Sequence, residues 1–287
     1  MIEKDEEKGE REGEKSTNIA LFIGMGSFIL ITQIIAILLA APFDVAGMTA
    51  FENPDDPLNP IIFFFIIIVF TALILVLFKF GGQKPVYFVM LAAVAITIYY
   101  VLMVIFPYAF IPEIGTLALA ILLYKYPEWY ILDATGLIIG GGAAAIFGIS
   151  LGILPVLLLM VILAVYDAIS VYKTKHMVSL AESVIDLRMP IIFVLPRKWS
   201  FSLTKGDEME DGFYMGLGDA IIPSVLVVSL FVTYEFAAPT LGALVGTLAG
   251  YAVLSTIAGR GKPHAGLPFL NSGAILGFAI GYMAMVV

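Results

Sequence analysis

Blocks of about 20 apolar residues recur along most of this chain, and each is long enough to cross the ~30 Å hydrocarbon core of a bilayer as one helix. Of the 287 residues, 61% are hydrophobic and only 13% are charged. Soluble domains carry roughly 25% charged residues, so this balance excludes a soluble enzyme. The absence of cysteine excludes disulfide scaffolds and thiolate chemistry. The sequence therefore predicts an all-α, polytopic membrane protein.

Nine transmembrane spans are expected, and the fourth is the shortest. They cover about 18–41, 60–78, 86–106, 110–124, 131–151, 154–172, 213–235, 237–258 and 271–287. We expect a single membrane domain over 17–287, with spans one to six in 18–172 and spans seven to nine in 213–287. The preceding segment, 1–16, is dominated by acidic, basic and glycine residues. Because it has little to bury, it is expected to be a disordered, uncleaved cytoplasmic tail.

The positions of the basic residues test this number of spans. With nine spans, all 15 Lys and Arg residues fall on the N-terminal side of the membrane, at positions 4, 8, 11, 15, 79, 84, 125, 173, 175, 188, 197, 198, 205, 260 and 262. The charged residues of the opposite loops are all acidic, namely Asp44, Glu52, Asp55, Asp56, Glu113 and Glu235. Cytoplasmic loops are enriched in Lys and Arg. We therefore expect a multi-pass protein of the cell membrane, with a cytoplasmic N-terminus and its C-terminus outside.

The longest polar connection, 173–212, lies between spans six and seven. It contains a β-branched run from Pro190 to Pro196, which fits either a short strand or an extended loop with two turns. Spans five, eight and nine carry glycine or alanine at every fourth position along part of their length. Such stripes let helix backbones approach closely in lipid, so we interpret them as packing faces.

Two acidic residues lie well inside the apolar spans, Asp167 in span six and Asp219 in span seven. Burying a carboxylate in a membrane is costly, so such residues are candidates for function. Asp133 and Glu235 lie near the ends of spans. From there their side chains could reach the membrane interface, so we expect these two acids to be structural.

The two buried aspartates are expected at one depth. Asp167 lies six residues before Lys173 and Asp219 lies eight after Asp211, roughly 9 and 12 Å from the cytoplasmic charges. Antiparallel helices then bring the carboxylates together, where one keeps a proton and the pair can act as acid and base. That is the chemistry of an aspartic protease. Depth alone favours a proton-coupled secondary transporter equally, because transporters also use membrane-embedded acids.

Local motifs favour the protease. Gly216, Leu217 and Gly218 lead directly into Asp219, and glycine allows the backbone to bend and another chain to approach closely. Tyr166, beside the other aspartate, either orients its neighbour or packs at the interface.

A second motif, the run Leu267, Pro268, Phe269 and Leu270, precedes span nine. Proline there is expected to keep the entrance to the span non-helical. These apolar side chains cannot transfer protons, so their expected contribution is to position the substrate.

This combination resembles the presenilin and signal peptide peptidase family of GxGD intramembrane aspartyl proteases. Residues 166–176 are most similar to the archaeal presenilin homologues, and the resemblance extends over nearly the whole hydrophobic chain. It implies a presenilin-like fold in which Asp167 and Asp219 are the catalytic pair and the GLGD glycines support them. Pro268–Leu270 then corresponds to the family's PAL turn, with Phe269 in place of the usual alanine.

The resemblance also implies the substrates, which are proteins with a transmembrane helix that unwinds locally before attack. The unwound stretch is expected to be held by strand addition to 190–196. The lipid bilayer is the other expected partner. No cofactor, metal, nucleic acid or obligate accessory subunit is implied. Signal peptide peptidases have the inverted topology, so the basic residues place this chain with the presenilins.

Other classes of membrane enzyme fit the sequence poorly. The chain has no HExxH motif for a zinc protease, and its only histidines, His176 and His264, lie in charged loops. A rhomboid-like serine protease needs a membrane-embedded histidine. Prepilin peptidases usually have lysine two residues after the GxGD aspartate, where this chain has Ile221. A proton-coupled transporter remains the alternative, and a non-enzymatic membrane scaffold is a more distant one.

Overall fold

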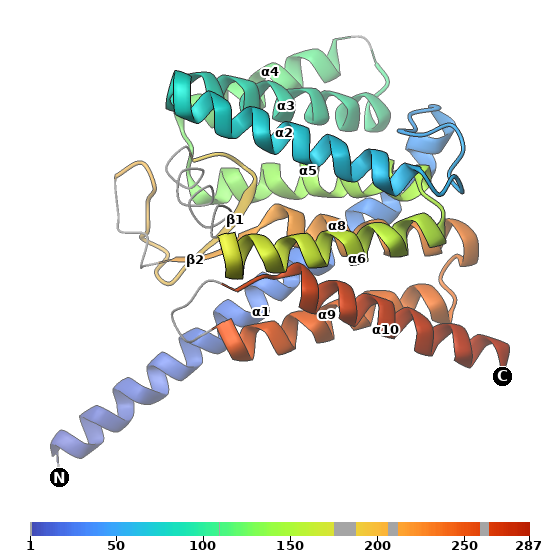
Figure 1. Cartoon of the computed structure of the whole chain (residues 1–287). Coiled ribbons are helices and arrows are strands. Elements are labelled where there is room, and N and C mark those ends of the chain that lie inside the picture. Colours follow the sequence, from blue (N-terminus) through green and yellow to red (C-terminus); the bar gives the residue numbers. More distant parts are fainter. Residues whose placement is uncertain (1, 109, 175–187, 206–211, 259–263) are drawn as a thin grey trace.

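The computed structural model of the chain describes residues 2–108, 110–174, 188–205, 212–258 and 264–287, with side chains from residue 19 onward. Over these residues the chain forms nine α-helices and one two-stranded sheet (Figure 1). The helices are α1 (Ile2–Val45), α2 (Asn59–Gly81), α3 (Gln83–Ile105), α4 (Ile111–Lys125), α5 (Trp129–Ser150), α6 (Ile153–Ile169), α8 (Leu217–Tyr234), α9 (Ala238–Ala258) and α10 (Leu267–Val286). A short π-helix, η1 (Ser170–Thr174), continues α6, and the strands are β1 (Ile192–Pro196) and β2 (Gly212–Gly216). The predicted helical membrane fold is confirmed.

Eight of the described helices are long and apolar enough to cross a membrane, and they correspond to eight of the nine predicted spans. The remaining predicted span, 110–124, is α4. This helix has 15 residues and extends only about 22 Å, less than the thickness of a hydrocarbon core. The sequence therefore locates α4 correctly, although α4 is shorter than the eight helices that correspond to the other predicted spans.

α1 begins at Ile2, so it includes most of the segment 1–16 for which the composition predicts disorder. The prediction of disorder rests only on the lack of side chains to bury. Glu, Lys and Arg also have high intrinsic helix propensity, which favours continuation of the membrane helix into this segment. The division between a tail and a membrane domain at residue 17 stays a prediction.

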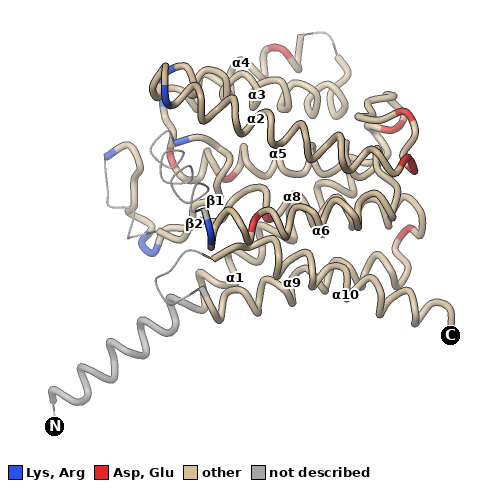
Figure 2. The backbone as a smooth tube through the Cα atoms, in the orientation of Figure 1, with Lys and Arg blue, Asp and Glu red and all other residues tan. Residues whose placement is uncertain are grey.

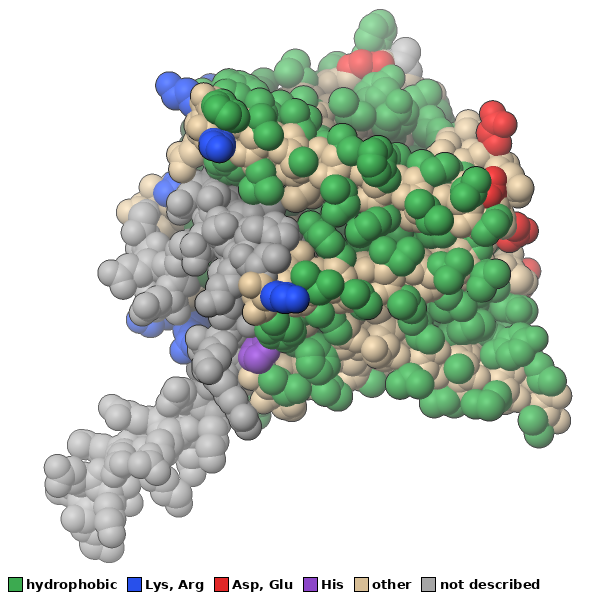
Figure 3. Space-filling view, in the orientation of Figure 1, with side chains coloured by type: hydrophobic (Ala, Val, Ile, Leu, Met, Phe, Trp, Pro, Cys, Tyr) green, Lys and Arg blue, Asp and Glu red, His purple; other side chains and the backbone are tan. Residues whose placement is uncertain are grey.

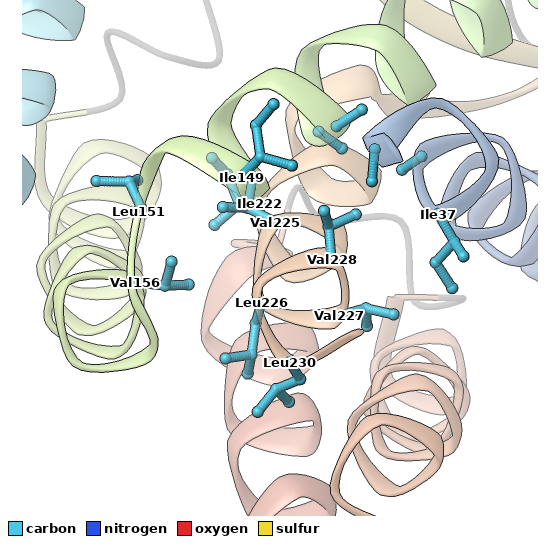
Figure 4. Close-up of a cluster of buried hydrophobic side chains, with 14 of the residues drawn as sticks. Ile37, Ile149, Leu151, Val156, Ile222, Val225, Leu226, Val227, Val228 and Leu230 are labelled. Atoms are coloured by element: carbon cyan, nitrogen blue, oxygen red, sulfur yellow. The ribbon is translucent and has the colours of Figure 1, made fainter. Parts of the chain in front are cut away.

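α5 and α8 form the centre of the bundle. In each of them 61% of the membrane-spanning window is buried inside the protein, compared with 11% in α2. Ile149 of α5 lies beside Ile222 and Val225 of α8 in one apolar cluster (Figure 4). A Cβ atom on Gly148 would collide with Val228. Glycine in α5 therefore allows the two central helices to approach closely.

The glycine stripes of α9 and α10 face each other. A Cβ atom on Gly246 would collide with the carbonyl group of Gly273, and one on Gly277 with the carbonyl group of Gly242. The two backbones are in direct contact, as small residues allow between membrane helices. The predicted packing faces are confirmed for this pair.

The predicted strand within 190–196 is present as β1. It pairs antiparallel with β2, and this pairing places Val194 opposite Tyr214. The sequence analysis assigns residues 213–216 to span seven, whereas the structure places them in β2 and begins α8 at Leu217. Periodicity does not distinguish such a short apolar run from the first turn of a helix. The pairing with β1 decides its conformation.

The surface of the bundle is apolar along its side and charged at its ends. Figure 3 shows hydrophobic side chains over the face in view. Figure 2 shows the described Lys and Arg residues at one end of the bundle, and most of the described Asp and Glu residues towards the other. This separation matches the charge pattern on which the span prediction depends.

Candidate active site

Three helices contribute to one site in the interior of the bundle. α6 carries Asp167 near its C-terminal end, and α8 carries Asp219 in its first turn. α10 begins at Leu267, directly after Gly266. The residues that lead into α10 contact both aspartates.

Asp167 is held by the start of α10. Its side chain is only 8% exposed, and its Oδ2 atom accepts a hydrogen bond from the Leu267 N–H at 3.2 Å. The backbone of Gly266 also hydrogen-bonds this carboxylate. The first N–H groups of a helix have no partner within the helix, so α10 has donors available for Asp167.

Asp219 is partly buried and lies against Gly266. A Cβ atom on Gly266 would lie 2.6 Å and 2.8 Å from the two carboxylate oxygens of Asp219, so a larger residue there would have to displace this carboxylate. Asp219 also lies within range of an electrostatic interaction with Asp167. Both carboxylates therefore contact the dipeptide Gly266–Leu267.

The two glycines that precede Asp219 are not needed for a backbone bend. Gly216 has φ −60°, and Gly218 is not among the positive-φ residues of the described chain. The chain passes from β2 into α8 at Gly216 without a left-handed residue. A Cβ atom on Gly218 would meet no atom within 4 Å, so the space beside this residue is open. Leu217, between them, is buried, and its N–H donates to the Ile191 carbonyl at 2.9 Å.

The entrance to α10 differs from the expectation. The sequence predicts a non-helical turn at Leu267–Leu270, whereas α10 begins at Leu267 and Pro268 lies in its first turn. Proline is tolerated there because the missing N–H would have no partner within the helix and its fixed φ suits a helix start. Leu270 is fully buried, and Phe269 packs against the apolar core.

Two tyrosines lie close to Asp167 in the sequence. Tyr166 packs edge-to-face against Phe64 of α2, with ring centroids 5.6 Å apart. Tyr172 lies in η1, and its hydroxyl oxygen accepts the Ala265 N–H at 3.3 Å and lies 3.4 Å from Nδ1 of His264. The sequence analysis missed Tyr172, because no pattern in the sequence predicts the π-helical turn that carries it.

Asn271 provides a second bond between α10 and α6. It is 1% exposed, and its Nδ2 atom donates to the Met160 carbonyl at 2.9 Å. A polar residue inside an apolar span is a signal that the sequence analysis did not use. His176, by contrast, lies outside the described residues. Among the residues that the structure describes, no group of three or more His, Cys, Asp or Glu side chains is placed to hold a metal.

Residues 7–287 match the family described as signal-peptide peptidase, presenilin aspartyl protease. The chain belongs to this family. Two solved structures, each described as a presenilin family intramembrane aspartate protease, are 41% and 43% identical to it and crystallised in space groups C222 and P2. The first covers 92% of this chain and 99% of its own, with a TM-score of 0.70. For the second these values are 91%, 97% and 0.68. A comparison with curated proteins finds no match.

Membership of the presenilin and signal peptide peptidase family gives the activity in outline. The protein is an intramembrane aspartyl protease and an integral, multi-pass membrane protein. The resemblance inferred from the YD, GLGD and LPFL motifs is confirmed. The comparisons favour the protease over the transporter and the scaffold.

Proposed function

We propose that Asp167 and Asp219 form the catalytic dyad and hydrolyse peptide bonds within transmembrane helices of other proteins. The observation that carries this proposal is the contact of both carboxylates with Gly266–Leu267. Two carboxylates in one low-dielectric site do not both ionise easily, so they share a proton. The pair then supplies one base and one acid.

The reaction is the addition of water followed by loss of an amine. The ionised carboxylate takes a proton from water as the water oxygen bonds to the scissile carbonyl carbon, and the protonated carboxyl gives its proton to the carbonyl oxygen. The resulting gem-diol collapses when one carboxyl of the dyad gives its proton to the peptide nitrogen while the other carboxylate takes a proton from a gem-diol hydroxyl, which restores the singly protonated pair. The C–N bond then breaks, and the acid and the amine leave.

The neighbours of the dyad have supporting roles in this proposal. The Leu267 N–H holds the Asp167 carboxylate in place through its Oδ2 atom. The open space beside Gly218 allows the substrate backbone to approach Asp219. Leu267, Pro268, Phe269 and Leu270 position the substrate without transferring protons.

The sheet edge that we propose for the substrate differs from the one expected from the sequence. The sequence analysis assigns strand addition to 190–196, but one N–H on the outer edge of β1 is already bonded, because Val194 donates to Oδ1 of Asp133 on α5 at 2.7 Å. Among the described strands, β2 pairs only with β1, and β2 ends at the exposed Gly216, three residues before Asp219. We therefore propose that the unwound substrate adds to the second edge of β2.

Single Asp167→Asn and Asp219→Asn variants test the dyad. Each is expected to lower the cleavage rate by roughly 10⁴-fold, because the remaining carboxylate cannot supply both acid and base. The measurement is cleavage of a single-span substrate in liposomes. Glu113→Gln, which removes an exposed acid from α4, is the matched control and should cleave normally. Substantial activity in either aspartate variant contradicts the dyad.

A proline scan of the substrate tests strand addition. Proline has no N–H to donate to a neighbouring strand, so a proline at a pairing position beside the cleaved bond should abolish cleavage. Alanine at the same position should be accepted. The readout is product mass for each substrate. Equal cleavage of the proline and alanine series would show that no strand forms.

A further inference from the structure

A third buried carboxylate lies outside the site. Asp133, in the second turn of α5, is 3% exposed, so its side chain lies in the protein interior. Its Oδ1 atom accepts the Val194 N–H at 2.7 Å, and its Oδ2 atom is buried with no hydrogen-bond partner in the described part of the chain. Nothing in the proposed chemistry uses this carboxylate.

The bond from Val194 occupies one N–H on the outer edge of β1. Residues of a strand point their N–H groups alternately to its two sides, and Val194 points its N–H away from β2 towards α5. Asp133 therefore stands where an additional strand would otherwise offer an acceptor. A buried N–H left without any partner is costly, so this one side chain fastens the strand to the helix.

The same face of α5 receives the rest of the sheet. Asp133, Gly136 and Gly140 are three and four residues apart and so lie on one side of the helix. A Cβ atom on Gly136 would lie 3.2 Å from the Phe193 ring, and one on Gly140 would lie 3.0 Å from the Leu217 side chain. This face therefore supports β1 first and then the first residue of α8.

Glu128, directly before α5, fastens the segment that follows β1. Its carboxylate accepts hydrogen bonds from the Ser202 hydroxyl at 2.7 Å and from the Leu203 N–H at 3.1 Å. The beginning of α5 thus carries two carboxylates, one bonded to the strand and one bonded to the chain beyond it.

The position of the sheet determines the position of Asp219. β2 is paired with β1 up to Gly216, and the Leu217 N–H donates to the carbonyl of Ile191, just before β1. Asp219 follows two residues later in the first turn of α8. A displacement of β1 on α5 is therefore transmitted through β2 to the dyad and to the substrate-binding edge.

We propose that Asp133 is a positioning residue of the protease: it docks the β1–β2 sheet on α5, and so sets the position of the substrate strand and of Asp219 relative to Asp167. This inference rests on the proposed dyad and on strand addition at β2. Asp133 itself touches no reacting atom.

Three variants test it, with KM, kcat and product mass as readouts. Asp133→Ala removes the acceptor of the Val194 N–H. Because a buried donor then loses its partner, we expect KM to rise about tenfold and the cleaved bonds to change. Asp133→Asn keeps an acceptor oxygen and should restore the wild-type KM and products. Asp133→Glu keeps the carboxylate but moves it by one methylene, so it should shift the products in a protein that still folds.

Ser229→Ala is the matched control, because it removes another buried tertiary hydrogen bond, to the Leu151 carbonyl, away from the sheet. It should lower thermal stability and leave KM and the products unchanged. If Asp133→Ala and Asp133→Glu behave like this control, or if Asp133→Asn behaves like Asp133→Ala, the inference is wrong. Failure of the dyad itself is recognised separately, by cleavage in Asp167→Asn or Asp219→Asn.

Discussion

At the scale of single residues, Gly266 shows how closely the site is packed. A Cβ atom here would meet the carboxylate of Asp219, and the next residue, Leu267, donates its N–H to Asp167. No motif in the sequence marks this glycine, because its constraint comes from an aspartate 47 positions earlier in the chain. Its role is steric.

Gly266→Ala is predicted to inactivate the protease while leaving it folded. The new methyl group would lie 2.6 Å from Oδ2 of Asp219, so the carboxylate must move by an ångström or more. A misplacement of that size is expected to lower kcat about 100-fold. Cleavage kinetics and the unfolding temperature are the measurements. Wild-type kcat in this variant would show that the two groups are not in contact in the active enzyme.

At the scale of elements, the start of α10 is fixed by Pro268. The proline terminates the helix on its N-terminal side at the place where the Leu267 N–H is free to bond Asp167. The start of α10 therefore contributes a backbone N–H to the site, in addition to the side chains proposed to position the substrate.

Pro268→Ala is therefore predicted to lower turnover strongly and to weaken binding of a dyad-directed transition-state analogue. Alanine adds an N–H and removes the restraint on where the helix begins. Phe269→Ala restores the residue usual in the family and is the comparison variant. It should be tolerated or shift the preferred bond. If Pro268→Ala cleaves at the wild-type rate and at the same bonds, the proline only marks the start of the helix and has no role in the site.

At the scale of the whole molecule, the charges at the two ends of the bundle predict its orientation (Figure 2). Lys and Arg face the cytoplasm in most membrane proteins, so the β1–β2 end, which carries Arg197, Lys198 and Lys205, is expected there. The C-terminus is expected outside.

Tags test this orientation in intact cells. A tag at Val287 should be reached by an impermeant reagent from outside, and a tag in 198–210 only after the membrane is opened. The physical reason is that eight helices long enough to cross, together with α4, separate the acidic loops from the basic ones. If both tags are reached from one side, the number of spans is wrong, and the matched depth of the aspartates loses its basis.

Much of this architecture follows from the sequence by itself. Backbone groups in lipid must be bonded within their own segment, so apolar blocks of about 20 residues have to be helices. Because Asp167 and Asp219 interrupt such blocks at similar distances from charged ends, their shared depth could also be predicted. A strand near Pro196 could be proposed from the sequence because its β-branched composition and its flanking prolines are local features.

Only the tertiary structure decided the features that depend on contacts between distant segments. Residues 213–216 are a strand because β1 lies beside them, and the start of α10 is in place to donate the Leu267 N–H to Asp167. Asp133 is buried because β1 covers it. Periodicity measures what a segment buries, but it carries no information on which segment provides the covering atoms. That choice depends on the packing of α5, α6, α8 and α10 around one another.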